Sequence, residues 1–254
     1  MTVVISSSFL PLVTLVGLVA GVINTFAGGG GFIVLPTLIG LGLRPEVANG
    51  TMRVGLLLQN SSAVFAFHQR GLSDIATTWR LALPTTMGAI AGAYLATHTP
   101  SDWLRSVVGW AFLAWAIVLL IRPGRFLESP EAPRPLTPLT FLLSFLVGGY
   151  GGYLQAGVGL PLMALLVNAQ GFAPVQANAI KVALVLIYTC AIIPLFAVAK
   201  QIALLEGAAL AVGMLVGAWL GVRLQSGKRG AAAVRWVVFA MVLVSGALLA
   251  LFRR

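Results

Sequence analysis

Charged residues are the scarcest feature of this sequence. They make up 9% of the 254 residues, whereas a soluble domain carries roughly 25%. None precedes Arg44, and the stretches 136–179 and 237–252 contain none at all. Apolar runs of about 18 or more residues are typical of membrane-spanning helices. The chain is therefore expected to be an all-α polytopic membrane protein in a lipid bilayer.

Acids, histidines and cysteines are also few. One cysteine excludes an intrachain disulfide, and only six acids and two histidines are present. The acids all fall in loops or near the ends of expected helices. An enzyme needs a nucleophile with a base, or a cluster of metal ligands. The sequence therefore predicts neither an enzyme nor a resident metal or cofactor.

Positive charge is the exception, with a net charge of +10. The basic residues are scattered over short loops and form no stripe, so no nucleic-acid partner is expected. They indicate topology instead, because cytoplasmic loops are enriched in Lys and Arg. Nine fall on one side of the expected helices, which favours that side as cytoplasmic: Arg70, Arg80, Arg122, Arg125, Arg134, Arg223, Lys228, Arg229 and Arg235. Five fall on the other: Arg44, Arg105, Lys200, Arg253 and Arg254.

Three separate blocks of sequence recur at one offset of 129 residues. Gly42, Pro45, Ala48 and Asn49 reappear as Gly171, Pro174, Ala177 and Asn178. Ala27, Gly28 and Gly30 reappear as Ala156, Gly157 and Gly159, and Gly88 and Gly92 reappear as Gly217 and Gly221. This pattern predicts two homologous transmembrane repeats, 1–121 and 136–254, joined by a linker over 122–135. The last two glycine pairs are small-xxx-small motifs, which pack helices within a chain or at a homodimer face.

Each repeat shows five apolar segments. We expect helices over 8–26, 32–43, 45–68, 75–98 and 103–121, and over 137–153, 160–169, 174–198, 203–225 and 232–252. The second segment of each repeat is too short to cross a bilayer core of about 30 Å. The first two segments either both cross or form a re-entrant hairpin, which gives five or three crossings per repeat, and about eight to ten helices in all. Either number is odd, so the repeats are expected to be inverted, with the linker in the cytoplasm and both termini outside.

The run of glycines from Gly28 to Gly31 interrupts an apolar segment, and the sequence from Gln155 to Gly159 interrupts its counterpart. Unwound backbone at membrane depth is tolerated where it is buried or lines a watery cavity. Helix ends exposed there attract anions through unpaired N–H groups. Paired broken segments of this kind are typical of a transporter binding site.

One cation lies deep in the third segment of each repeat. Arg53 follows Pro45 by eight residues and Lys181 follows Pro174 by seven, which places each about 10–12 Å into its helix. A cation at that depth costs about 2.5–3.5 kcal/mol, so snorkelling to the interface is the alternative to a function. We expect an anion site with one cation from each repeat. The predicted substrate-binding residues are Asn24, Thr25, Gly28, Gly29, Gly30, Asn49, Thr51, Arg53, Gln155, Gly157, Asn178 and Lys181.

The run GLVAGVINTFAGGGGFIVLPTLIGLGLRPEVANGTMRVG resembles the signature of the sulfite exporter TauE/SafE family of membrane proteins. A weaker second copy reads GGYGGYLQAGVGLPLMALLVNAQGFAPVQANAIKV. The resemblance implies export of small sulfur-containing anions, of the sulfite, sulfonate or sulfoacetate type, across the bacterial cytoplasmic (inner) membrane. The second copy departs at Ala179 and Ile180, which stand opposite Gly50 and Thr51, so the two half-sites are not expected to be equivalent.

Alternating access of the two repeats, driven by the membrane potential, is the mechanism that these features favour. The interior-negative potential pushes anions outward, and no intramembrane acid or histidine indicates proton coupling. The alternatives are an anion channel, or a carrier for another small carboxylate or oxyanion, including a proton-coupled one. A homodimer is plausible for so small a carrier.

Overall fold

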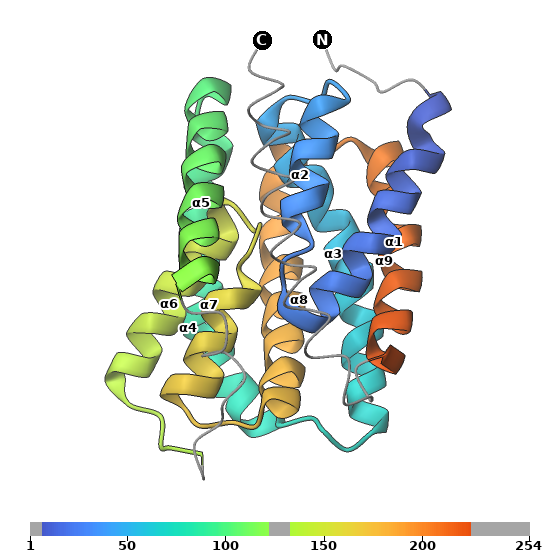
Figure 1. The fold of residues 1–254 in the computed structure, drawn as a ribbon. Helices are drawn as coiled ribbons and strands as arrows, with labels where there is room; N and C mark the ends of the chain where they lie inside the picture. Colours follow the sequence, from blue (N-terminus) through green and yellow to red (C-terminus); the bar gives the residue numbers. More distant parts are fainter. Residues whose placement is uncertain (1–6, 122–132, 225–254) are drawn as a thin grey trace.

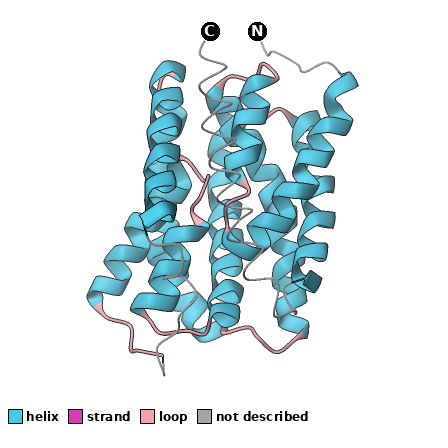
Figure 2. Ribbon diagram, viewed as in Figure 1, coloured by secondary structure: helices cyan, strands magenta, loops and turns pink. Residues whose placement is uncertain are grey.

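The computed structural model describes residues 7–121 and 133–224, and all regular structure within these ranges is helical (Figures 1 and 2). A short 3₁₀ turn, Ser7–Phe9, precedes the first helix. The helices before the linker are α1 (Leu10–Ala27), α2 (Gly31–Gly40), α3 (Pro45–Gln69), α4 (Ile75–His98) and α5 (Ser101–Ile121). Those after it are α6 (Pro138–Tyr153), α7 (Gly159–Met163) with its π-helical continuation η2 (Ala164–Ala169), α8 (Pro174–Val198) and α9 (Leu204–Leu224).

The expected all-helical fold is confirmed, and the helix bounds agree with the sequence-based ones to within three residues. The expected helix over 232–252 and most of the linker lie outside the described residues. By length and composition, two described helices could cross a membrane, over Pro174–Val198 and Leu204–Arg223. Others, such as α2, are apolar but shorter. Large apolar side chains are exposed along α4, among them Leu83, Met87 and Ile90, as expected for a surface that faces lipid.

Local sequence signals set the helix starts. α3, α6 and α8 each begin with a proline in the first turn, where the missing N–H is not needed. α4 begins at Asp74, whose carboxylate accepts from the N–H of Thr77 at 2.9 Å. α6 adds a capping box, in which Thr137 and Thr140 exchange side-chain and backbone hydrogen bonds. The segments therefore start where their sequences specify.

The breaks between α1 and α2 and between α6 and α7 lie together in the middle of the molecule (Figure 1). α1 and α2 form a hairpin that opens toward one end of the molecule, and α6 and α7 form a hairpin that opens toward the other. A Cβ atom added to Gly28 would meet the backbone of Gly159, and one added to Gly31 would meet that of Ala156. The two breaks are therefore in direct backbone contact.

The turns between the helices lie at two opposite ends of the molecule. The upper end in Figure 1 carries the α2–α3 loop (41–44) and the α8–α9 turn (199–203). The lower end carries the α3–α4 turn (70–74) and the loop before α8 (170–173). α3 therefore runs from the upper end to the lower end, and α8 runs the opposite way.

Residues with positive φ occur in pairs that are 129 positions apart in the sequence. The pairs are Gly28 (φ 73°) with Gly157 (φ 77°), Gly42 (φ 105°) with Gly171 (φ 78°), and Gly71 (φ 68°) with Lys200 (φ 56°). The turns that contain Gly71 and Lys200 also share a hydrogen bond. The N–H of Leu72 donates to Phe67 O at 3.1 Å, and the N–H of Gln201 donates to Phe196 O at 2.9 Å. The same local fold thus occurs at the same place in both segments of sequence.

Small residues let two pairs of helices approach closely. Gly88 and Gly92 of α4 lie against backbone carbonyls of α6, at Phe145 and Gly149. Gly217 of α9 lies in the same way against Leu18 O of α1. Both glycine pairs predicted from the sequence therefore pack helices within the chain.

Candidate functional site

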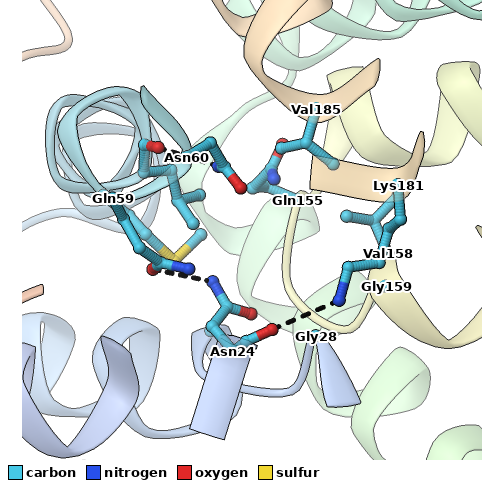
Figure 3. A pocket seen from close by; sticks show the side chains of 12 residues that line it. Asn24, Gly28, Gln59, Asn60, Gln155, Val158, Gly159, Lys181 and Val185 are labelled. Carbon is cyan, nitrogen blue, oxygen red and sulfur yellow. Dashed lines mark hydrogen bonds between the residues drawn. The ribbon is translucent and has the colours of Figure 1, made fainter. Parts of the chain in front are cut away.

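Lys181 of α8 is 2% exposed, and its amine lies at the end of the broken helix α1. Its Nζ donates to the carbonyl of Asn24 at 3.3 Å (Figure 3). Asn24 O is among the last carbonyls of α1, where the helix dipole is negative. Within the described residues Lys181 forms no ion pair. Its amine is therefore bound by the carbonyl of Asn24, and the side chain does not snorkel to the interface.

Arg53 of α3 is fully buried and occupies the corresponding place at the end of α6. Its Nη2 donates to Gly152 O at 2.6 Å and its Nη1 to Gly151 O at 3.2 Å. Nη1 also donates to Gln155 Oε1 at 3.2 Å, and the guanidinium carbon lies 4.3 Å from the centre of the Phe196 ring. Arg53 thus binds one helix end through several contacts, a geometry that the planar guanidinium provides and an ammonium does not.

Two asparagines complete this exchange between the halves. Asn49 of α3 donates to Tyr153 O at the end of α6, at 2.8 Å. Asn178 of α8, its counterpart at the offset of 129, donates to Thr25 O near the end of α1, at 2.7 Å. Helix ends leave carbonyls without partners in the helix. Each third helix therefore caps the broken first helix of the other half with one asparagine and one cation.

A cavity of about 20 Å³ lies beside the breaks (Figure 3). That is room for about one water molecule. Its polar lining consists of Lys181 and four carboxamides, Asn24, Gln59, Asn60 and Gln155. The rest of the wall is glycine and apolar side chains: Gly28, Gly31, Met52, Leu56, Val158, Gly159 and Val185. The cavity is a small pocket that presents one basic side chain and several amides.

The hydrogen bonds orient two of these amides as donors. Gln59 Oε1 accepts from Asn24 Nδ2 at 3.1 Å. Gln155 Oε1 accepts from Arg53 and also from the Tyr188 hydroxyl at 3.0 Å. Because the side-chain oxygens of Gln59 and Gln155 already accept hydrogen bonds, both amides present their N–H donors to the cavity. Donors beside an ammonium are chemically better suited to an anion than to a cation.

The structure separates the predicted site residues into two groups. Asn24, Gly28, Gln155 and Lys181 line the cavity. The others surround the breaks or lie farther off: Thr25, Gly29, Gly30, Asn49, Thr51, Arg53, Gly157 and Asn178. Thr25 donates within α1 to Gly21 O, and Thr51 accepts the N–H of Ala203 at the α8–α9 turn.

The prediction of unpaired N–H groups at the start of α2 is wrong in part. The N–H groups of Phe32 and Ile33 donate to Gly29 O and Gly30 O, and that of Gly30 donates to Asn24 Oδ1 at 3.2 Å. A tight first turn and a side-chain cap satisfy them. The side chains, more than the helix end, therefore define the chemistry of the cavity.

Gln59 and Asn60 were not predicted from the sequence. A signal was present, because Asn49, Arg53 and Asn60 are spaced by four and seven residues and so share one face of α3. Adjacent amides in the middle of an apolar helix are rare unless they have a polar partner. Within the described residues, no group of three or more His, Cys, Asp or Glu is placed to hold a metal ion.

An all-helical chain with apolar outer surfaces and a buried polar cavity at two helix breaks has the features of a membrane transporter. The sulfite exporter TauE/SafE family profile matches residues 13–249. The chain therefore belongs to this family of membrane transporters, which confirms the resemblance and the expectation that it is not an enzyme.

Several curated proteins are similar to this chain. One from Sinorhizobium sp., named "Probable membrane transporter protein ORF9", is 31% identical over 163 residues, which cover 63% of this chain and 62% of that protein. The YfcA protein of Escherichia coli K12, named likewise, is 25% identical over 88% of this chain and 83% of its own length. A relative from Haemophilus influenzae is 26% identical over 87% of this chain and 86% of its own length. No solved structure matches the chain.

Proposed function

We propose that this chain exports small sulfur-containing anions, of the sulfite, sulfonate or sulfoacetate type, through the cavity at the two helix breaks. One observation carries the proposal: Lys181 is buried at the cavity without an ion pair among the described residues, and amide donors surround it. The family description supplies the class of anion.

Lys181 is the primary anion ligand in this proposal. An ammonium has three donor hydrogens, and Asn24 O accepts one of them. The others, with the amides of Gln59 and Gln155, bind the oxyanion. Arg53 acts differently, because its contacts are with α6 and its side chain is not part of the cavity wall. It holds Gln155 in place and ties α3 to the end of α6.

Alternating access of two inverted repeats follows from the same arrangement. The hairpins open toward opposite ends, the left-handed residues pair at the offset of 129, and each half caps the other. These features support re-entrant hairpins with three crossings in each repeat. Because the cavity holds about one water, an anion can enter only after the repeats move apart.

The membrane potential drives export in this scheme. No Asp, Glu or His lines the cavity among the described residues, so the lining itself supplies no proton carrier. The potential contributes about 2.3 kcal/mol per charge per 100 mV and pushes anions out of an interior-negative cell. The lower end is cytoplasmic, because the loops there carry the larger share of basic residues. The linker over 122–135 then lies inside and both termini outside the inner membrane.

Flux measurements in proteoliposomes test this function. Vesicles loaded with labelled sulfoacetate should release it, and an interior-negative potassium diffusion potential should accelerate the release. A pH gradient alone should have little effect. Release that ignores voltage and follows a proton gradient would refute the driving force, and no release of any sulfur-containing anion would refute the substrate class.

A further inference from the structure

The two ends of the molecule differ in how tightly α3 and α8 are packed. At the upper end, α3 is packed directly against the α8–α9 turn and α9. A Cβ atom on Gly50 would overlap Gln201 O, and the hydroxyl of Thr51 accepts the N–H of Ala203 at 2.9 Å. Further along, Val54 lies against Gly207. These contacts bring α3, the α8–α9 turn and α9 directly together.

The counterparts at the lower end, 129 residues away, enclose space instead. Ala179 and Ala183 of α8 correspond to Gly50 and Val54, and Thr78 of α4 corresponds to Gly207. These three residues line a cavity of about 300 Å³. Its other lining residues come from the lower end of α3, the start of α4 and α8: Val64, Phe67, His68, Ser73, Asp74, Ile75, Trp79, Leu186 and Ile187.

A small apolar cluster lies next to this lower cavity on the way to the central one. It consists of Ala63, Phe67, Ala179 and Val182. On α3, Ala63 follows Asn60 of the central cavity by one turn. On α8, Val182 directly follows Lys181, and it falls between the faces that line the two cavities. The cluster therefore lies where α3 and α8 pack together, between the faces of α8 that line the two cavities.

We propose that the lower cavity is the vestibule through which the anion reaches Lys181, and that the structure is the state open to the lower end. The inference rests on the proposed transport function. Arg70 in the α3–α4 turn and Arg80 near the start of α4 are close in sequence to residues that line the vestibule, and positive charge there raises the local concentration of anions. In the opposite state, the contacts of Gly50, Thr51 and Val54 separate and the counterpart vestibule opens at the upper end.

Cysteine accessibility tests this assignment with a matched pair. The background is Cys190→Ser, which removes the single native cysteine. Ala183→Cys places a thiol in the vestibule, and Val54→Cys places one at the equivalent sealed position. A membrane-impermeant maleimide is applied to oriented vesicles from each side, and Ser73→Cys reports which side carries the lower end. Ala183→Cys should react at least about tenfold faster than Val54→Cys, and only from the lower side.

Two further readings complete the test. Sulfoacetate should slow labelling of Ala183→Cys and speed labelling of Val54→Cys as it promotes exchange between the two states. Labelled Ala183→Cys should lose most of its own prior flux, because the maleimide fills the path. Equal labelling of the two cysteines, or full flux after labelling, would overturn the vestibule. Flux of no anion with the labelling difference intact would instead refute transport and leave the asymmetry standing.

Discussion

The two helix breaks have similar backbones but differ in the cation that caps each of them. The end of α6 is bound by Arg53 through two carbonyls, a side-chain amide and an aromatic ring. The end of α1 is bound by Lys181 through one carbonyl at 3.3 Å. Both side chains compensate a helix C-terminus, yet Lys181 alone also lines the cavity.

This difference indicates that two similar helix breaks can have different functions. The two Nη atoms of Arg53 donate to groups at the end of α6 and hold that break in place. In the proposed site Lys181 keeps donors for a ligand, so it would exchange Asn24 O for an anion. An anion at Lys181 would weaken the tie between α8 and α1, which couples binding to movement of the halves. If the two breaks differ in this way, substitutions at each of them should have unequal effects.

Gly28→Ala should have the largest effect. Gly28 has a positive φ, and a methyl group there would meet the backbone of Gly159, which has no rotamer to change. We expect a loss of about 2–4 kcal/mol, seen as a low yield of folded protein and a lower melting temperature in detergent. Gly157→Ala should be milder, because its methyl would meet the ring of Phe32 instead. Gly109→Ala, which meets no heavy atom within 4 Å, is the control and should not destabilise. Equal losses at Gly28 and Gly157 would show that the breaks do not differ in rigidity.

Arg53→Ala should come next. It leaves the buried carbonyls of Gly151 and Gly152 without their donor and removes the contact with Phe196. A loss of about 1–3 kcal/mol in stability is expected, with activity lost as a consequence. Arg53→Lys should lose less stability than Arg53→Ala but be less stable than the unsubstituted protein, because one donor nitrogen replaces two. A stable Arg53→Ala protein that fails only in anion binding would place Arg53 in the site and abolish the distinction from Lys181.

Much of this architecture could be predicted from the sequence, because its signals are local. Prolines and caps mark the helix starts, and glycines mark the breaks. The sequence predicts that Lys181 and Arg53 lie deep in their helices with no acid nearby in sequence to form an ion pair. Their different roles were not predictable, since the contacts of Arg53 with Gly151 and Gly152 join residues about one hundred positions apart. The sequence shows which side chains are costly to bury, but not what they contact.

Lys181→Met should remove anion binding while sparing the fold. The substitution keeps the length of the side chain and relieves the cost of a buried charge, about 2.5–3.5 kcal/mol on insertion scales. The melting temperature without ligand should therefore hold or rise, and the stabilisation by sulfoacetate should disappear. Lys181→Arg retains the charge and should keep part of that stabilisation. If Lys181→Met lowers the melting temperature as much as Arg53→Ala does, the lysine is a structural cap as well.

Gln59→Leu should have the smallest effect and is the most specific test of the cavity. Leucine has a similar size but no amide. The substitution therefore removes the donors that face the pocket and also the oxygen that accepts from Asn24. Loss of one such hydrogen bond corresponds to about five- to tenfold weaker sulfoacetate binding, measured by calorimetry. Thr51→Val is the matched control on the same helix, because its hydroxyl faces Ala203 and not the cavity. It should lower stability by about 1 kcal/mol and leave affinity unchanged. Weaker binding in Thr51→Val but not in Gln59→Leu would move the site from the cavity to the upper end, and Lys181 would then share the purely structural role of Arg53.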